Sequence, residues 1–230
     1  MEYFNIEYSL DSEETGEVYP QAVFENPLKL EPNPVLRANQ CFPGELPPDN
    51  IPPFNYFILQ NEAKLTDLMR SSLRGNGFLI SAKLRELLEK SNVTDYKFYD
   101  VKLYKKDVEI KDYYYFHSAC CLSQFVDYPN SEFYIGDTSK NYIRDLDFVP
   151  QNLDDLENLQ KQLPYGHELV CVDYFFLKPN FPFNLDFFRI GVFNFDFFIT
   201  RRFKEKLEQN KITGLSILPM DDFIMTPNLA

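Results

Sequence analysis

The chain has 230 residues, with 23 basic and 35 acidic side chains and a formal net charge of −12. This acidity argues against nucleic-acid binding, because neutralising a phosphate backbone requires a basic surface. Hydrophobic residues make up 44% and charged residues 25%, which is typical of a globular domain and excludes a disordered chain. Aromatic residues reach 17% without any tryptophan, and this content of Tyr and Phe favours strands over a helical bundle.

The first 53 residues form an acidic, proline-rich segment. Up to residue 31 it holds eight acidic side chains and one basic side chain, a net charge of −7. Nine of the 16 prolines lie between Pro20 and Pro53, so we expect extended, irregular chain here. Interspersed aromatic and aliphatic residues predict that this N-terminal arm, residues 1–53, packs on the body of the protein. Our candidate partner-binding residues lie in this arm and are Asp11, Glu13, Glu14 and Glu17.

Neither a secretory signal nor a membrane span is expected. The N-terminus lacks a basic region followed by an apolar stretch, and no segment approaches the roughly 18 uninterrupted apolar residues of a spanning helix. Four cysteines, two of them adjacent, are a poor basis for a disulfide framework. These features predict a soluble protein of the reducing cytoplasm.

Strands and short helices alternate from residue 54 onward. FNYFILQ, which begins at Phe54, predicts a strand, and the polar stretch from Glu62 to Leu73 has apolar residues at helical spacing. A second strand, FLI, precedes Ser81, which is placed to cap a helix with a leucine-rich face. KFYDVKLY then alternates between apolar and polar residues, as a half-buried strand does.

The strand–helix–strand unit of residues 78–101 returns 119 residues later, over residues 197–220. At this offset Phe78 matches Phe197, and the two N-caps match as Ser81 and Thr200. No gap is needed over about two dozen positions, which predicts an internal duplication of this unit.

The remaining segments complete the expected fold. YYYFHS and IRDLDFV predict strands, NLDDLENLQKQL predicts a helix capped by Asn152, and HELVCVDYFFL and FFRIGVFNFDFF predict aromatic strands. Strands therefore outnumber helices. We expect an α+β fold with a mixed or largely antiparallel sheet and a few short helices, and a single domain over residues 54–230.

Histidine and cysteine provide the only candidate metal ligands with recognisable spacing. These residues are His117, His167, Cys120, Cys121 and Cys171. Thiolates and imidazoles are zinc ligands, and a Cys–His pair is also a possible nucleophile. However, all three cysteines lie in apolar, strand-like runs, where free Cys behaves as a small hydrophobic residue. We therefore expect core cysteines, with no metal, cofactor or catalytic residue.

Three segments carry a resemblance to the immunity proteins of bacterial polymorphic-toxin systems. They are FLISAKLRELLEKSNVTDYKFYDVKLY, YYYFHSACCLSQFVDYPNSEF with its Asp127, Tyr128 and Ser131, and FRIGVFNFDFFITRRFKEKLEQNKITGLSILPM. Together they cover roughly residues 54 to 220. The resemblance implies a small cytoplasmic protein that binds and blocks a cognate toxin, and it brings no catalytic residues with it.

Non-catalytic binding of a toxin is therefore the leading hypothesis, and a strongly acidic protein favours a basic partner. One alternative is a metal-dependent or hydrolytic enzyme, which predicts His117, His167 and the cysteines around one cleft. Another is a homodimeric interaction module, in which exposed aromatic side chains form the dimer surface. We expect neither nucleic acid nor membrane as a partner.

Overall fold

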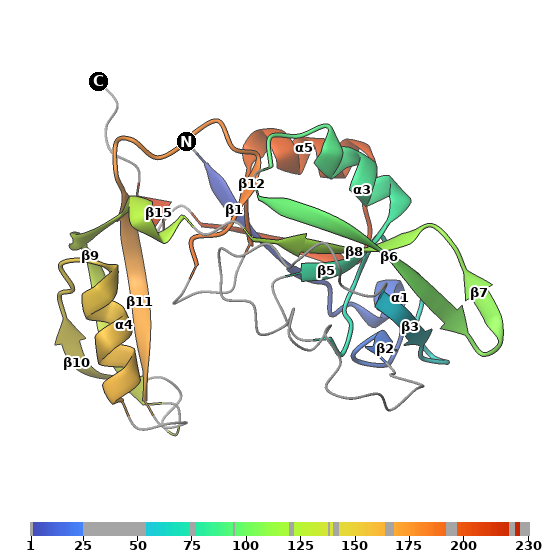
Figure 1. Ribbon diagram of the computed structural model, residues 1–230, viewed down its shortest axis with the longest axis horizontal. Helices are drawn as coiled ribbons and strands as arrows, with labels where there is room; N and C mark the ends of the chain where they lie inside the picture. The colour runs from blue at the N-terminus through green and yellow to red at the C-terminus, as the bar shows by residue number, and fades with distance from the viewer. Residues whose placement is uncertain are drawn as a thin grey trace.

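A computed structural model of the protein describes residues 2–24, 54–73, 77–93, 95–119, 122–137, 139, 143–163, 168–191, 197–220 and 224–225. Within these ranges the chain forms three β-sheets and four α-helices (Figure 1). The helices are α1 (Ser12–Thr15), α3 (Ala82–Glu89), α4 (Leu153–Gln162) and α5 (Arg201–Gln209), with a 3-10 turn at Ser123–Phe125. The strands are β1 (Tyr3–Tyr8), β2 (Ala22–Phe24), β3 (Phe54–Leu59), β4 (Leu68–Met69), β5 (Gly77–Ser81), β6 (Tyr96–Lys105), β7 (Val108–Ile110), β8 (Tyr113–Ser118), β9 (Val126–Asp137), β10 (Ile143–Phe148), β11 (Glu168–Leu177), β12 (Phe187–Phe188), β13 (Phe197–Thr200), β14 (Leu215–Pro219) and β15 (Ile224–Met225).

The three sheets are mixed or antiparallel. The seven-stranded sheet has the order β2-β3-β6-β8-β5-β4, with β7 paired to β6. The two four-stranded sheets have the orders β12-β13-β1-β14 and β10-β9-β11-β15. Parallel pairing within the sheets occurs between β3 and β6 and between β11 and β15, and the other strand pairs are antiparallel. The predicted α+β class with a mixed sheet is confirmed.

Both predicted units contain a strand, a helix and a strand, and in each a third strand lies between the two. β5 and β6, joined by α3, both pair antiparallel with β8. β13 and β14, joined by α5, both pair antiparallel with β1. The N-terminal strand therefore occupies in the second sheet the place that β8 occupies in the first. The two units belong to different sheets.

The correspondence extends upstream of the predicted repeat. In β4, Leu68 pairs with Ile80, and in β12, Phe187 pairs with Ile199. Phe187 and Ile199 each lie 119 positions after their counterparts, Leu68 and Ile80, and the same offset separates α3 from α5. The matching segments read DLMR over residues 67–70 and DFFR over residues 186–189. Whether the two units arose by duplication stays a prediction.

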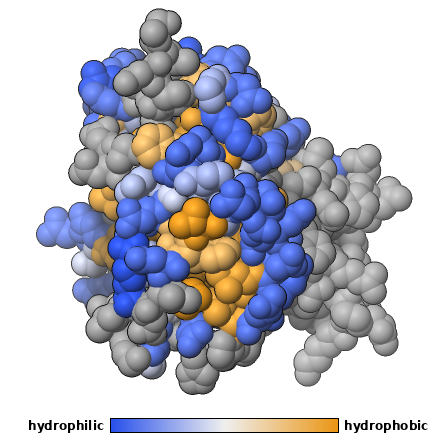
Figure 2. All heavy atoms as spheres, turned by 90° about the vertical axis from the view of Figure 1, so that its left-hand side faces the viewer, coloured by the Kyte–Doolittle hydropathy of each residue, from blue (hydrophilic) through white to orange (hydrophobic). Residues whose placement is uncertain are grey.

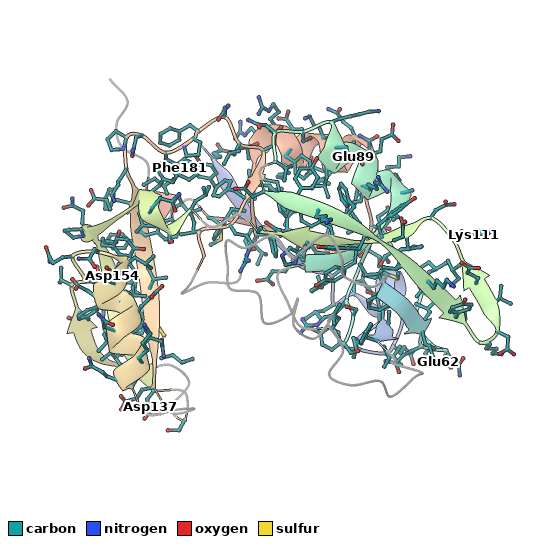
Figure 3. The ribbon with its side chains drawn as sticks, viewed as in Figure 1. Glu62, Glu89, Lys111, Asp137, Asp154 and Phe181 are labelled. Carbon is teal, nitrogen blue, oxygen red and sulfur yellow. The ribbon has the colours of Figure 1, made fainter. Side chains whose placement is uncertain are left out.

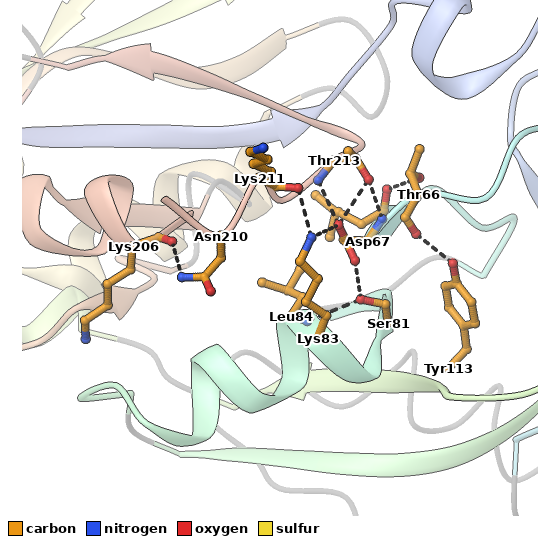
Figure 4. A network of polar contacts seen from close by, with 11 residues as sticks. Thr66, Asp67, Ser81, Lys83, Leu84, Tyr113, Lys206, Asn210, Lys211 and Thr213 are labelled. Carbon is orange, nitrogen blue, oxygen red and sulfur yellow. Dashed lines mark hydrogen bonds and ion pairs between the residues drawn. The ribbon is translucent and has the colours of Figure 1, made fainter. Parts of the chain in front are cut away.

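Asp67 joins the two units on one side of the shared core (Figure 4). Its carboxylate accepts a hydrogen bond of 2.6 Å from the hydroxyl of Ser81, the N-cap of α3. It also accepts a bond of 3.0 Å from the backbone N–H of Thr213, which follows α5. Lys83 lies 3.4 Å from the same carboxylate and donates to the carbonyl of Lys211. One side chain thus fixes the start of one helix relative to the end of the other.

Asp186 likewise joins the start of one helix to the end of the other, on the opposite side of the shared core. Its buried carboxylate accepts from the hydroxyl of Thr200, the N-cap of α5, and from the backbone N–H of Asn92, which follows α3. Arg202 donates to it at 2.6 Å, and Lys206 lies 3.5 Å away. Burial acts to raise the pKa of Asp186, but the hydrogen bonds and the two cations outweigh burial and lower it.

Three hydrophobic clusters form the core. The central cluster lies between the two sheets that carry α3 and α5, and it contains Leu84, Leu88, Phe203 and Leu207 from the helices. A second cluster lies on the opposite face of the large sheet and contains side chains from β2, β3, β4, β5, β6 and β8. A third joins β12, β13 and Tyr3 to β9, β11 and α4. Burial of each large apolar side chain contributes about 1.5–3 kcal/mol relative to exposure, so the core ties both helices to both sheets.

The described residues between 122 and 177 form a lobe at one side of the molecule, with α4 packed on β11 (Figure 1). The predicted N-cap Asn152 accepts a hydrogen bond from the backbone N–H of Asp155. Leu156 is buried in the third cluster, and the other leucines of the predicted apolar face pack against it. The predicted helix of this lobe and its apolar face are confirmed.

The predicted helix between Glu62 and Leu73 is wrong. Residues 68 and 69 instead form β4, because their backbone pairs with β5 and places both side chains in the core. Thr66 donates to the carbonyl of Leu68, a local bond that competes with helical hydrogen bonding. Tertiary pairing overrides helical spacing in a segment only a few turns long. The boundary of the predicted N-terminal arm at residue 53 lies outside the described residues, but β1 is a central strand with Tyr3, Phe4 and Ile6 buried.

Candidate partner-binding surface

The four acidic residues of the N-terminal segment gather around helix α1. Asp11 is the N-cap of this helix, and its carboxylate accepts a hydrogen bond of 2.9 Å from the N–H of Glu13. Acidic side chains in the first turn interact favourably with the helix dipole, which explains the place of Glu13 and Glu14. Asp11, Glu13 and Glu17 are exposed, whereas Glu14 is half-buried. The sequence thus predicted a surface cluster, and the structure brings its four members together on one short turn.

Helix α1 is held against the segment that precedes β4. The N–H of Lys64 donates to the carbonyl of Thr15 at 2.9 Å, and the Lys64 ammonium donates to the carbonyl of Glu13 at 2.6 Å. Gly16 ends the helix with φ +91°, and an added Cβ there would lie 2.0 Å from the carbonyl oxygen of Glu62. Only glycine accommodates both the positive φ and this close approach. The acidic turn is therefore fixed relative to the body.

A pocket of about 400 Å³ lies beside α1. Its lining combines apolar, hydroxyl and charged groups, from Ser9, Leu10, Ser12, Thr15, Gly16, Glu17, Val18, Tyr19, Gln21 and Arg70. Leu10 is 78% exposed and Tyr19 is 53% exposed, which places two large apolar surfaces at the acidic turn. Exposed aromatic and apolar groups beside charges are typical of protein-interaction surfaces.

Arg70 is the positive group of this pocket. Its guanidinium carbon lies 4.3 Å from the ring centroid of Tyr19 and 5.2 Å from that of Tyr8. Burial raises the pKa of Tyr8, and the charge of Arg70 partly offsets that increase. Sequence reasoning missed Arg70. The match of DLMR to DFFR at the 119-residue offset was the available signal.

A second acidic surface lies on the 122–177 lobe, which carries ten acidic and three basic residues and a net charge of −7. Arg144 on β10 contacts Glu132, Asp147 and Asp173 at 2.6, 2.6 and 3.1 Å. Hydrogen bonding from Arg144 lowers the pKa of Glu132. Three carboxylates around one guanidinium leave this network negative. A sum of the charges in each segment of the sequence would have revealed this second acidic surface.

The lobe faces the viewer in Figure 2, where an apolar patch is enclosed by hydrophilic residues. Among the residues that the structure describes in the lobe, Val149 is 60% exposed and Leu169 is 37% exposed. Figure 3 shows Asp154 on α4 and Asp137 at the end of β9, so carboxylates lie along the length of the lobe. Both acidic surfaces thus combine carboxylates with exposed apolar groups.

The predicted histidine and cysteine cluster is only partly within the described residues. His117 is buried on β8, and Cys171 is half-buried on β11, in a different sheet. Burial raises the pKa of the Cys171 thiol, which disfavours the thiolate that metal binding or nucleophilic attack requires. His167, Cys120 and Cys121 lie outside the described residues. Within the described ranges no group of three His, Cys, Asp or Glu side chains is placed to hold a metal ion.

Comparison with known protein families identifies the family to which this chain belongs. The sequence model of an immunity protein family, Imm11, matches residues 2–222. The chain belongs to the Imm11 immunity protein family. A search of curated proteins found no match. The predicted resemblance to immunity proteins is confirmed, and the match includes the N-terminal segment with the acidic turn.

Membership in an immunity protein family indicates a toxin-neutralising role, and such proteins are in general not catalysts. None of the helices in the described part of this Imm11 protein is long and apolar enough to cross a membrane.

Proposed function

We propose that this Imm11 protein neutralises a cognate bacterial toxin of a polymorphic-toxin system by direct, non-catalytic binding in the cytoplasm. The family match over residues 2–222 is the observation that carries the proposal. In this proposal the protein covers a functional surface of the toxin and performs no reaction of its own.

The acidic turn of Asp11, Glu13, Glu14 and Glu17 is the proposed toxin-contact surface. Its backbone is fixed to the body by Gly16 and Lys64, so little ordering is required when a partner binds. Exposed carboxylates steer a basic partner and accelerate association, most strongly at low salt. The proposed partner is therefore a basic toxin domain.

The two strand–helix–strand units are proposed to be copies of one ancestral unit that now serve as the scaffold for this surface. The equivalent pairings of Leu68 with Ile80 and of Phe187 with Ile199 support this proposal. Each unit is completed by a strand from elsewhere in the chain, and in the second unit that strand is β1, which leads directly into α1. The rigid core thereby positions the acidic turn.

Co-expression tests the proposed function. The protein is produced in its host with an affinity tag, the co-purifying polypeptide is identified, and that polypeptide is expressed with and without the protein. We expect growth arrest by the toxin alone, rescue by co-expression, and a one-to-one complex by light scattering. A co-purifying polypeptide that is equally toxic with and without the protein would overturn the proposal. A self-association product alone would instead support the homodimeric module.

A further inference from the structure

Arg70 is displayed in the pocket beside α1 with its hydrogen-bonding groups available. The rings of Tyr19 and Tyr8 flank its guanidinium at 4.3 and 5.2 Å from their centroids. Among the residues that the structure describes, its guanidinium makes neither an ion pair nor a hydrogen bond. Stacking on tyrosine faces orients a guanidinium without using its N–H donors. The planar fork therefore remains free to bind an anionic group.

The equivalent residue in the second unit shows what this arginine does when it is structural. Arg189 lies 119 positions later, is completely buried, and has its guanidinium carbon 5.0 Å from the ring centroid of Phe197. The same position is thus enclosed by the core in one unit and open to a pocket in the other. Filling the core does not account for Arg70, because its side chain is exposed.

The surroundings of Arg70 select the class of anion. Glu17 lines the same pocket, and Asp11 and Glu13 are exposed on the adjoining turn. These carboxylates repel a dianion such as phosphate more strongly than a monoanion. A carboxylate matches the guanidinium fork with two parallel hydrogen bonds. The pocket volume of about 400 Å³ exceeds the volume of a single acidic side chain, so its attached backbone also fits.

We propose that Arg70 binds a carboxylate of the toxin in this pocket, and that the surrounding acidic turn contacts basic residues that flank it. The identity of the partner rests on the proposed function. One acidic group within a basic surface would fix the register of the complex, because a partner that places a basic group there meets Arg70 with like charge.

The first arm of the test uses small probes and needs no toxin. The side-chain Nε–H resonance of Arg70 is followed by NMR during titration with N-acetylglutamate α-methylamide, whose side-chain carboxylate is its only charge, with the neutral N-acetylglutamine α-methylamide, and with inorganic phosphate, all at constant ionic strength. We expect a saturable shift with N-acetylglutamate α-methylamide only, and no saturable change in the backbone amide resonances around the pocket when this probe is added to Arg70→Gln. Arg201, an exposed arginine paired with Glu2, is the internal control and is expected not to shift. No shift at Arg70, or an equal shift with phosphate, would overturn the carboxylate assignment.

The second arm uses the toxin recovered with the wild-type protein. We expect Arg70→Gln to weaken binding about tenfold or more, Arg70→Lys to fall between, and Arg201→Gln to change affinity less than about twofold. Equal affinities of wild type and Arg70→Gln would overturn this inference and leave the proposed function intact. Saturable binding of N-acetylglutamate α-methylamide at Arg70 without any toxin binding would overturn the proposed function and support the pocket as a carboxylate site.

Discussion

Asp67 and Asp186, 119 residues apart, make equivalent contacts in the two units of the protein. Each carboxylate accepts from the N-cap hydroxyl of the helix in its own unit, and from a backbone N–H just after the helix of the other unit. Each backbone carbonyl also accepts from the N–H of that N-cap residue, at 2.9 and 3.1 Å. The two aspartates therefore act as reciprocal braces that hold the units around their shared core.

Removing the charge of Asp186 is expected to destabilise the protein in a pH-dependent way. At neutral pH we expect Asp186→Asn to lower the free energy of unfolding by about 2 kcal/mol, because the buried carboxylate bonds a backbone N–H and two cations. Its pKa is lowered in the folded state, so its contribution is complete above the unfolded pKa of about 3.9 and is lost as pH falls through the folded value. Urea unfolding at several pH values measures both effects.

Asp154→Asn is the matched control, because Asp154 is an exposed carboxylate in the first turn of α4. We expect it to change stability by less than about 1 kcal/mol. A difference between wild type and Asp186→Asn that grows below pH 4 would contradict the assigned direction of the pKa change.

Gly16→Ala is expected to displace the acidic turn. The substitution requires a residue with Cβ at φ +91° and 2.0 Å from the carbonyl oxygen of Glu62. We expect a loss of about 2 kcal/mol in the free energy of unfolding, and weaker toxin binding as α1 shifts. Thermal unfolding and titration calorimetry measure the two effects. Glu17→Ala, at the exposed neighbour, is the stability control, and a Gly16→Ala protein as stable as this control would refute the close-packing argument.

Neutralising the acidic turn is expected to slow association with the toxin. The variant Asp11→Asn, Glu13→Gln, Glu14→Gln, Glu17→Gln removes four charges and keeps an N-cap acceptor at position 11. We expect the association rate constant to fall by about tenfold at low salt and to approach the wild-type value at high salt.

The matched control for this variant removes four charges from the 122–177 lobe, at Asp154, Asp155, Glu157 and Glu168. We expect it to leave the association rate nearly unchanged in stopped-flow measurements. If instead this control alone slows association, the toxin contacts the lobe and the acidic turn is a solvated surface.

The two equivalent arginines are expected to differ in their effect on stability. Arg189→Gln leaves a smaller polar group in a completely buried site beside Phe197, and we expect a loss of about 3 kcal/mol. Arg70→Gln alters an exposed side chain and is expected to change stability by less than about 0.5 kcal/mol. Chemical denaturation compares the two, and similar losses would show that Arg70 also has a structural role.

Removing metal ions is expected to leave the protein unchanged. In the part of the chain that the structure describes, no group of three His, Cys, Asp or Glu side chains is placed to hold a metal ion, so dialysis against EDTA should not alter the thermal unfolding temperature. Removal of a structural zinc ion would lower that temperature, because such a site contributes directly to folding. His117→Asn and Cys171→Ser should likewise retain toxin binding. Stoichiometric zinc in the purified protein, with a chelator-dependent loss of stability, would favour the alternative of a metal-dependent enzyme.

Local signals in the sequence were sufficient for the helices α3, α4 and α5. Ser81, Asn152 and Thr200 all cap the helices they were predicted to cap, because an N-cap acts on backbone N–H groups two or three residues away. The helix predicted near Leu68 failed because its spacing was compatible with two structures, and pairing with β5 decided between them.

The sequence by itself determined the α+β composition, the acidity of the N-terminal turn and the resemblance to immunity proteins, since these depend on residue content and short-range pattern. Tertiary structure alone decided that β1 completes the second unit, that Asp67 and Asp186 brace both helices, and that Arg70 is open where Arg189 is enclosed. Tyr3 pairs with Thr200, 197 positions away, and the two aspartates accept from backbone N–H groups 146 and 94 positions away. Periodicity and capping do not reach across such separations, whereas strand pairing and the burial of a common core do.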